Sequence, residues 1–301
     1  MKKAAGFILV ALLIAALALN TWWVDTTTRQ AVARDGGRLI QTPGVTANVK
    51  VEGEGPAIVM IHGFGAAIDW WDEIAPDLAK DHRVIRIDLI GHGGTAAPRS
   101  GYTIERQASM VSDVLDKLGA NRITVIGHSM GGEVATALTE IDPKRIERLI
   151  YIDSPPTAGT TFTILTDAYM QPVLGEFLSR LVTDRSIRKG LAQGFAPGFP
   201  IRSKFVSDLE QLTYQAFRSA HEDSIRYRTQ KPPYERLAAV TPVPPLLAIF
   251  GSRDAIVPPD HANFFLRVPG AKTATIEGAG HSPMVEQPAK TLELIRGFLK
   301  Q

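Results

Sequence analysis

The amino-acid sequence predicts an α/β fold in which helices cover both faces of a doubly wound, mainly parallel β-sheet. Short, almost wholly apolar runs alternate along the chain with longer segments of helical periodicity. Strands of a parallel sheet are buried on both faces and therefore have such runs. Hydrophobic residues make up 45% of the 301 positions and charged residues 21%, which excludes a disordered chain or a coiled coil. A chain of this length buries enough surface for one large core, so we expect one domain with an insertion.

The apolar runs that we interpret as strands are rich in β-branched residues and are bounded by Gly, Asp or Pro. The segments that we interpret as helices have apolar residues three and four positions apart. The predicted strands are Ala57–Ile61, Arg83–Ile87, Ile123–Ile126, Leu149–Ile152 and Leu246–Phe250. The predicted helices are Trp70–Ala79, Thr103–Leu118, Met130–Ile141 and Ala289–Leu299.

The amino terminus predicts a membrane segment. Lys2 and Lys3 precede an uncharged run, Ala4–Val24, which at about 1.5 Å per residue reaches roughly 30 Å, the thickness of a bilayer core. We therefore expect residues 1–24 to be a signal-anchor and the rest of the chain to lie on the outer, periplasmic or extracellular, side of a membrane. The alternative is a signal peptide cleaved after Ala16-Leu17-Ala18, which predicts a secreted protein.

The rest of the chain divides into a short tether and one domain. Residues 25–44 are polar and contain Gly36-Gly37, so we interpret them as a tether, and residues 45–301 as the domain. Strand-like runs are absent from the sequence between about 156 and 232, where helical spacings continue. We expect this part to be a helical insertion, interrupted by the Gly/Pro/Phe-rich segment Gly194–Pro200.

Charge and cysteine content exclude several classes of site. The 33 Lys and Arg residues nearly balance the 31 Asp and Glu residues, and the net charge of +2 predicts no nucleic-acid partner. The absence of cysteine excludes disulfides, thiolate nucleophiles and cysteine-bound metals. Neither a dinucleotide-binding glycine pattern nor a phosphate-binding loop is present in the sequence, so we expect no cofactor and no metal.

The segment Gly127-His128-Ser129-Met130-Gly131 joins a predicted strand to a predicted helix. The pattern G-x-S-x-G in that position is typical of a nucleophile elbow, a sharp turn that exposes the serine above the edge of a sheet. Glycine is needed on either side because a Cβ atom there would strike the neighbouring strand or helix. The pattern predicts Ser129 as a nucleophile.

Four further motifs occur in the order that one family requires, and with them the chain resembles the α/β-hydrolase superfamily. The resemblance is to its lid-bearing serine esterase-like branch and covers about Val45 to the end of the chain. It implies the α/β-hydrolase fold and the order Ser, Asp, His along the chain. The motifs are His62-Gly63-Phe64-Gly65, Asp88-Leu89-Ile90-Gly91-His92-Gly93, Gly251-Ser252-Arg253-Asp254 and Gly278-Ala279-Gly280-His281-Ser282-Pro283.

The resemblance implies a catalytic triad of Ser129, Asp254 and His281. An imidazole must remove the serine proton, and a buried carboxylate must orient and stabilise that imidazole. Asp153, at the end of the strand after the nucleophile helix, is the alternative acid. The expected oxyanion-hole donors are the backbone amides of Phe64 and Met130. For His62, His92 and Asp88 we expect structural hydrogen bonds.

The insertion is expected to be a lid that forms the roof of an apolar substrate pocket. The alternative is that its aromatic residues form only a small core of its own. We expect His128, Phe195 and Phe199 to bind substrate. Further candidates to face the pocket are Phe162, Leu165, Tyr169 and Phe177.

The sequence thus predicts a serine hydrolase that cleaves a small-molecule carboxylic ester with an apolar acyl or alcohol group through an acyl-enzyme. Hydrolysis of a carbon–carbon bond, acyl transfer and perhydrolysis need the same triad and are alternatives. Because Ser129 stands where epoxide hydrolases and haloalkane dehalogenases of this fold have Asp, those reactions are disfavoured. A non-catalytic ligand-binding receptor is the alternative from a different class, since a fold alone does not determine function.

Overall fold

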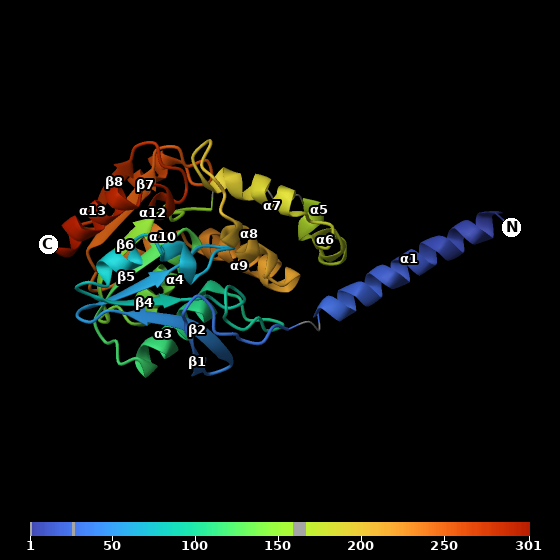
Figure 1. Ribbon diagram of the computed structural model, residues 1–301, viewed down its shortest axis with the longest axis horizontal. Coiled ribbons are helices and arrows are strands. Elements are labelled where there is room, and N and C mark those ends of the chain that lie inside the picture. The colour runs from blue at the N-terminus through green and yellow to red at the C-terminus, as the bar shows by residue number, and fades with distance from the viewer. Residues whose placement is uncertain (1, 26–27, 159–166) are drawn as a thin grey trace.

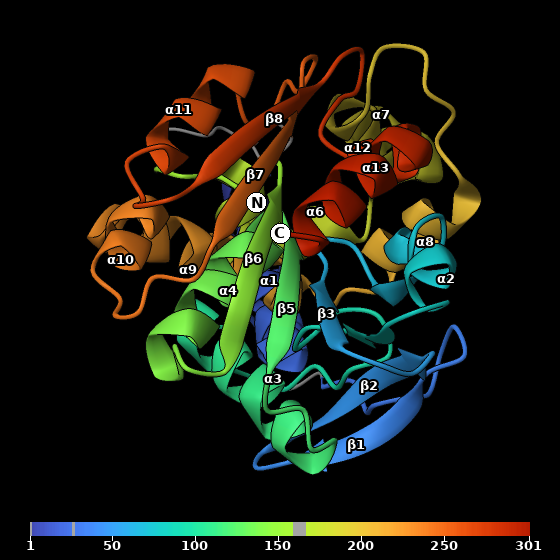
Figure 2. The same cartoon turned by 90° about the vertical axis from the view of Figure 1, so that its left-hand side faces the viewer.

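The computed structural model describes residues 2–25, 28–158 and 167–301, and its centre is one sheet of eight strands. The strand order is β1-β2-β4-β3-β5-β6-β7-β8, and Figure 2 shows β1 and β8 at the two edges. The strands are β1 Arg38–Thr42, β2 Val45–Glu52, β3 Ala57–Ile61, β4 Arg83–Ile87, β5 Ile123–His128, β6 Ile146–Ile152, β7 Leu246–Gly251 and β8 Lys272–Ile276.

The sheet is mainly parallel. β1 pairs with β2 and β2 with β4 in antiparallel directions, whereas all pairs from β4 to β8 are parallel. The order reverses around β3, so that β5 follows on one side and β4 lies on the other. The predicted doubly wound α/β fold is confirmed. Parallel strands place their carboxyl ends at one edge, where ligands of such sheets bind.

Helices cover both faces of this sheet (Figure 2). An apolar core lies on each face, between the helices and the strands. On one face, α3 Ile104–Lys117, α4 Met130–Ile141 and α11 Ala262–Phe265 pack with the buried strand residues. On the other face lie a short 3₁₀ helix, Ile68–Trp71, and the helices α2 Ala75–Leu78, α12 Pro283–Glu286 and α13 Pro288–Leu299. Because helices cover both faces of the sheet, the central strands are apolar at almost every position.

Three strands are additions to the sequence prediction. β8 mixes Lys and Thr with its apolar residues because it is an edge strand and is only partly buried. β1 falls within residues 25–44, the segment expected to be a tether, and it pairs with β2 from Arg38 to Thr42. Upstream of β1, Arg29 forms an isolated bridge with Ala97 and donates from Nη2 to the backbone oxygen of Thr95 over 2.8 Å. Part of this segment is therefore attached to the domain.

The insertion between β6 and β7 consists of helices, and it lies on one side of the sheet in Figure 1. We call it the lid. It includes the 3₁₀ turn Ala192–Gly194, which precedes the glycine- and proline-rich segment. Its helices are α5 Asp167–Met170, α6 Pro172–Ser179, α7 Asp184–Leu191, α8 Ser203–Glu210 and α9 Tyr214–Gln230, and α10 Pro233–Ala238 leads back to β7.

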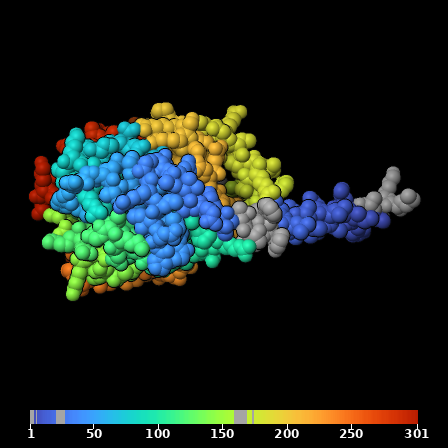
Figure 3. All heavy atoms as spheres, turned by 60° about the horizontal axis from the view of Figure 1, so that its bottom comes forward, coloured from blue at the N-terminus to red at the C-terminus, as the bar shows by residue number. Residues whose placement is uncertain are grey.

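The prediction of a membrane segment at the amino terminus is wrong. Helix α1, Lys2–Asp25, extends from the body of the molecule (Figure 3) and meets the rest of the described chain at α6 and α9. Throughout residues 2–25, 28–158 and 167–301, the structure has no helix that is both long and apolar enough to cross a bilayer. This finding also overturns the expected export and membrane anchoring.

Candidate active site

Ser129 stands on a strained turn between β5 and α4. Its backbone has φ 50° and ψ −122°, a conformation that L-residues rarely adopt. Its N–H donates to the backbone oxygen of Ile152 in β6 over 3.0 Å, which fixes the turn to the neighbouring strand. The side chain therefore projects at the carboxyl end of the central strand, next to the first N–H groups of α4.

Two glycines make this turn possible. A Cβ atom on Gly131 would lie 2.1 Å from the backbone oxygen of Ile61 in β3. A Cβ atom on Gly127 would lie 2.6 Å from the backbone oxygen of Gly131. No real Cβ is tolerated at such distances, so the G-x-S-x-G pattern is a packing requirement of the crossing between β3, β5 and α4.

Asp254 and His281 come together from two loops at the ends of β7 and β8. Nδ1 of His281 donates to Oδ2 of Asp254 over 2.7 Å. The other oxygen of Asp254 accepts from the backbone N–H groups of Ile256 and Val257 at 2.7 and 3.0 Å. Burial raises the pKa of Asp254, but the charge and hydrogen bond of His281 outweigh this and hold that pKa below its ordinary value. Asp254 is therefore a buried carboxylate that is already hydrogen-bonded to the imidazole ring of His281.

Asp153, the alternative acid, lies beside Asp254 and His281, but its carboxylate is hydrogen-bonded to a different group. Its Oδ1 accepts from the backbone N–H of Gly251 at 2.9 Å. Its carboxylate oxygen, an oxygen of Asp254 and a ring nitrogen of His281 lie within 4.8 Å of one another. Burial and the neighbouring charge of Asp254 raise the pKa of Asp153 well above its ordinary value. Burial thus disfavours the charged form of Asp153, whereas His281 favours the charged form of Asp254.

In the described ranges, Asp153, Asp254 and His281 are also the one group of three side chains placed closely enough to hold a metal ion. The ring nitrogen Nδ1 of His281 already donates to Asp254, and burial disfavours a charged Asp153. A ligand set must be deprotonated and free to bind, so this group does not fit a resident metal.

His128 lies between the nucleophile position and the imidazole loop. Its Nε2 donates to the backbone oxygen of His281 over 2.7 Å, which assigns the proton of this ring to Nε2. Burial lowers the pKa of His128 to about 3, so the ring is neutral. His128 also lines the cavity beside Ser129, and it stacks on Trp70 with ring centroids 6.4 Å apart.

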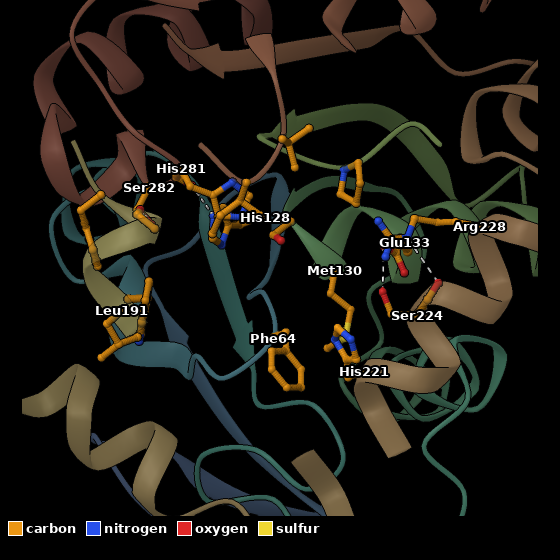
Figure 4. Close-up of a pocket in the computed structure, with 17 residues that line it drawn as sticks. Phe64, His128, Met130, Glu133, Leu191, His221, Ser224, Arg228, His281 and Ser282 are labelled. Atoms are coloured by element: carbon orange, nitrogen blue, oxygen red, sulfur yellow. Dashed lines mark hydrogen bonds and ion pairs between the residues drawn. The ribbon is translucent and has the colours of Figure 1, made fainter. Parts of the chain in front are cut away.

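A cavity of about 80 Å³ is lined by most of the predicted site residues, which come from distant parts of the chain (Figure 4), but not by Asp254 or Phe199. Ser129, His281 and His128 line it, as do both predicted oxyanion donors, Phe64 and Met130. The lid contributes a wall through six of its residues, and further lining residues come from the loops after β6, β7 and β8. The lid residues are Leu191, Gly194, Phe195, His221, Ser224 and Arg228, and the loop residues include Pro155, Ile256, Val257 and Ser282.

The end of this cavity away from His281 is polar. The sequence did not predict these polar residues. Glu133 of α4 is buried, and its Oε1 accepts from Ser224 Oγ at 3.0 Å and lies 3.2 Å from Arg228 Nε, both on α9 (Figure 4). Burial raises the pKa of Glu133 to about 7 against the lowering effect of Arg228 and Ser224. The sequence contains one indication of this polar end. Glu133 is an acidic residue in the first turn of α4, where its neighbours are small or apolar.

A second cavity of about 470 Å³ adjoins the first and shares Phe64 and Leu191 with it. Side chains of α7, α8 and α9 surround it, and most of them are aliphatic or aromatic. Its other lining residues are Tyr169, Ser179, Val182, Ser186, Ile187, Gly190, Leu209, Glu210, Leu212, Tyr214 and Phe217.

The aromatic candidates of the lid occupy different places. Phe195 is buried and lines the small cavity, whereas Phe199 stacks on Phe195 with ring centroids 5.0 Å apart. Tyr169 lines the second cavity. Phe177 is 42% exposed on α6. Phe162 and Leu165 lie outside the described residues.

His62 and Asp88 have structural partners. Nδ1 of His62 donates to the backbone oxygen of Gly63 at 2.8 Å, and its Nε2 accepts from the N–H of Leu89 at 3.0 Å. Asp88 accepts from the N–H groups of Ile68 and Gly94, each at 2.8 Å, and burial raises its pKa to about 6. These contacts fix the loop that carries Phe64 against the turn after β4.

Several known proteins are similar to this chain in sequence or in fold. The Alpha/beta hydrolase family matches residues 58–294. An uncharacterized protein of Mycobacterium bovis is 27% identical over 263 residues, which cover 83% of this chain and 77% of that protein. The 2-hydroxymuconate semialdehyde hydrolase of Pseudomonas sp. (strain CF600) is 28% identical, with 88% of this chain and 94% of that protein covered. An esterase structure from Exiguobacterium antarcticum has a TM-score of 0.75 and 21% identity over 88% of this chain and 100% of that chain, a likeness of fold alone.

Proposed function

The chain belongs to the alpha/beta hydrolase family, and from that membership and the geometry of its cavity we propose that it is a serine hydrolase that cleaves a carboxylic ester. The observation that carries the proposal is the 2.7 Å hydrogen bond from His281 to Asp254, beside the cavity into which the strained Ser129 turn opens. With Nδ1 bonded to the carboxylate, Nε2 is the ring nitrogen left to take a proton. The triad that we propose is Ser129, His281 and Asp254.

In the proposed reaction, Oγ of Ser129 attacks the ester carbonyl carbon while Nε2 of His281 takes the hydroxyl proton. Asp254 stabilises the positive imidazole, and the backbone N–H groups of Phe64 and Met130 donate to the oxyanion. The bond to the alcohol then breaks, and the alcohol leaves with the proton from His281. A water molecule, activated by the same ring, attacks the acyl-enzyme and releases the carboxylic acid and Ser129.

The second cavity is the place that we propose for the apolar group of the substrate. It adjoins the small cavity across Phe64 and Leu191, and its lining is mainly Leu, Ile, Val and aromatic side chains. Burial of each methylene in such a site is worth about 0.8 kcal/mol, close to fourfold in affinity. An ester with an extended apolar acyl or alcohol group is therefore a better candidate than a very short one.

Hydrolysis of a carbon–carbon bond is the second candidate. It is favoured by the similarity to 2-hydroxymuconate semialdehyde hydrolase, the relative that aligns over 94% of its own length. Both reactions use a serine, its base and an oxyanion hole, so they differ in the substrate that the lid and the polar end of the cavity admit. Parallel assays with p-nitrophenyl esters and a ring-cleavage diketone would separate them.

The test of the proposed function is a fluorophosphonate probe with intact-mass detection. We expect one adduct on the wild-type chain and none on Ser129→Ala. Ester turnover should fall by several orders of magnitude in Ser129→Ala and in His281→Ala, and the double variant should be little worse, because the residues act as a unit. An unlabelled wild-type chain without ester turnover would contradict the proposal and favour a ligand-binding receptor.

A further inference from the structure

Glu286, at the end of α12, bonds to the backbone on both sides of His281. Its Oε1 accepts from the N–H of Gly280 and from the N–H of Ser282, each at 3.1 Å. Its Oε2 lies 3.1 Å from the same Gly280 nitrogen. The carboxylate therefore fixes the residue before and the residue after the proposed base, while Asp254 and His128 hold His281 itself.

The same carboxylate also binds the lid. Oε2 of Glu286 accepts from the backbone N–H of Ala196 at 2.7 Å, the shortest of its contacts. We call the segment Gly194–Ala196, which follows α7 and precedes Phe199, the lid anchor. One side chain thus joins the lid anchor to the loop Gly278–Pro283, two segments that are about ninety positions apart in the chain.

Two further contacts seat the lid anchor on this loop. Oγ of Ser282 donates to the backbone oxygen of Gly194 at 3.3 Å. A Cβ atom on Gly280 would lie 2.4 Å from the nitrogen of Ala196 and 2.5 Å from the carbonyl carbon of Phe195. The two backbones are therefore in direct contact, and the position of one restricts the position of the other.

We propose that Glu286 is a positioning residue that couples the lid to the proposed base, so that His281 is held in its working place only while the lid anchor is seated. This inference rests on the proposed function, since it assigns a role to a neighbour of the triad. A carboxylate that accepts from three backbone N–H groups leaves all three without that partner when it is removed. The loop and the lid anchor then lose their common point of attachment.

The proposal has a consequence for lid motion. Small residues, such as the glycines of Gly194–Pro200, often form the hinges of lids. With Ala196 bonded to Glu286, an opening at this end of the lid would pull on Gly280 and Ser282 and displace the imidazole between them. Substrate entry must therefore occur by movement of other lid segments while the reaction proceeds with the lid anchor seated.

The kinetic test compares Glu286→Ala with the wild-type chain, using p-nitrophenyl butyrate and active sites counted by fluorophosphonate titration. A displacement of about 1 Å at a reacting group costs up to a hundredfold in rate, so we expect kcat per titrated site to fall about tenfold to a hundredfold. KM should change by less than about threefold. Glu286→Gln retains one acceptor oxygen and should recover part of the loss, and it also serves if the alanine variant does not fold. Glu293→Ala, an exposed carboxylate on α13, is the matched control and should resemble the wild type.

The coupling itself is measured by hydrogen exchange. In the wild-type chain, the phosphonate adduct on Ser129 should slow exchange at the amides of Gly280, Ser282 and Ala196 together. In Glu286→Ala, the amide of Ala196 should exchange at the same rate with and without the adduct. A merely structural role would lower thermal stability and the number of titrated sites, with unchanged kcat per site.

The two proposals fail in different ways. Unchanged kcat per titrated site in Glu286→Ala, or an Ala196 amide that still responds to the adduct, would overturn the coupling while the wild-type chain remains a Ser129-dependent esterase. A wild-type chain without labelling and without turnover would overturn the proposed function instead.

Discussion

Nε2 of His128 donates to the backbone carbonyl oxygen of His281 across 2.7 Å. The residue before the proposed nucleophile is thereby bonded to the residue that we propose as its base, although 153 positions separate them. Because burial lowers the pKa of His128 to about 3, the ring donates this bond as a neutral imidazole at every physiological pH. The relative positions of Ser129 and His281 therefore depend on a side chain that carries no charge.

The first prediction concerns this hydrogen bond. His128→Leu removes the donor and leaves a buried carbonyl oxygen unpaired, which costs about 1–3 kcal/mol. We expect the free energy of unfolding to fall by that amount and kcat to fall with it, whereas His128→Gln, which presents an N–H donor, should retain more of both. Urea unfolding and ester turnover measure the two effects. Equal behaviour of the Leu and Gln variants would show that the hydrogen bond does not position His281.

The second prediction distinguishes the two carboxyl groups near His281. Asp254→Asn replaces the acceptor of the Nδ1 proton and favours the wrong tautomer, so we expect kcat to fall by roughly 10⁴-fold. Asp153→Asn puts a neutral amide in place of a carboxyl whose charged form burial disfavours, and it should change kcat by less than about tenfold. The measurement is kcat at equal folded stability. A larger loss in Asp153→Asn would assign the acid to Asp153.

Much of the fold could be predicted because the central strands are buried on both faces. All five predicted strands are present, and their apolar runs need no knowledge of the neighbours. The helix predicted over Met130–Ile141 has those bounds in the structure, since its start is fixed by the turn at Ser129. β8 was missed because an edge strand that is half exposed has no continuous apolar run.

The site could be predicted only as far as local motifs reach. Ser129, Asp254 and His281 each lie in a short recognisable segment, and the structure brings all three to one side of the sheet. The polar end of the cavity follows from the packing of α4 against α9, which places Glu133 beside Arg228 across 95 positions of the chain. No local pattern reports such a pairing, because it depends on how the lid returns to the domain.

The third prediction concerns the pH dependence of stability. Burial raises the pKa of Glu133 to about 7 from 4.5, so the folded chain binds this proton more tightly than the unfolded chain does. The stability that this proton contributes is complete below pH 4.5 and is lost as the pH rises through about 7.

Glu133→Gln lacks the titrating group, which isolates this contribution. The free energy of unfolding of the wild type, less that of the variant, should therefore fall by roughly 3 kcal/mol between pH 4 and pH 8. Urea titrations across that range measure it. Glu140→Gln on the same helix, exposed and bonded to Arg236, is the control for loss of a carboxylate. A difference that stays constant with pH would contradict the raised pKa of Glu133.

The last prediction concerns the second cavity as the site of the apolar group. Leu209 lines this cavity, and its Cδ1 lies 2.5 Å from where a Cβ on Gly65 would be, close to the loop that carries Phe64. Leu209→Trp fills part of the 470 Å³ space without touching the small cavity beside Ser129. In the wild type, kcat/KM for p-nitrophenyl esters should rise by up to fourfold per added methylene until the cavity is full. In Leu209→Trp the rise should stop at a shorter chain, with butyrate turnover unchanged.

Leu266→Trp, at an exposed position, should keep the wild-type profile, because the added ring lies outside both cavities. A flat response to chain length in the wild type, or the same optimum in Leu209→Trp, would place the apolar group elsewhere and leave the larger cavity without a part in substrate choice.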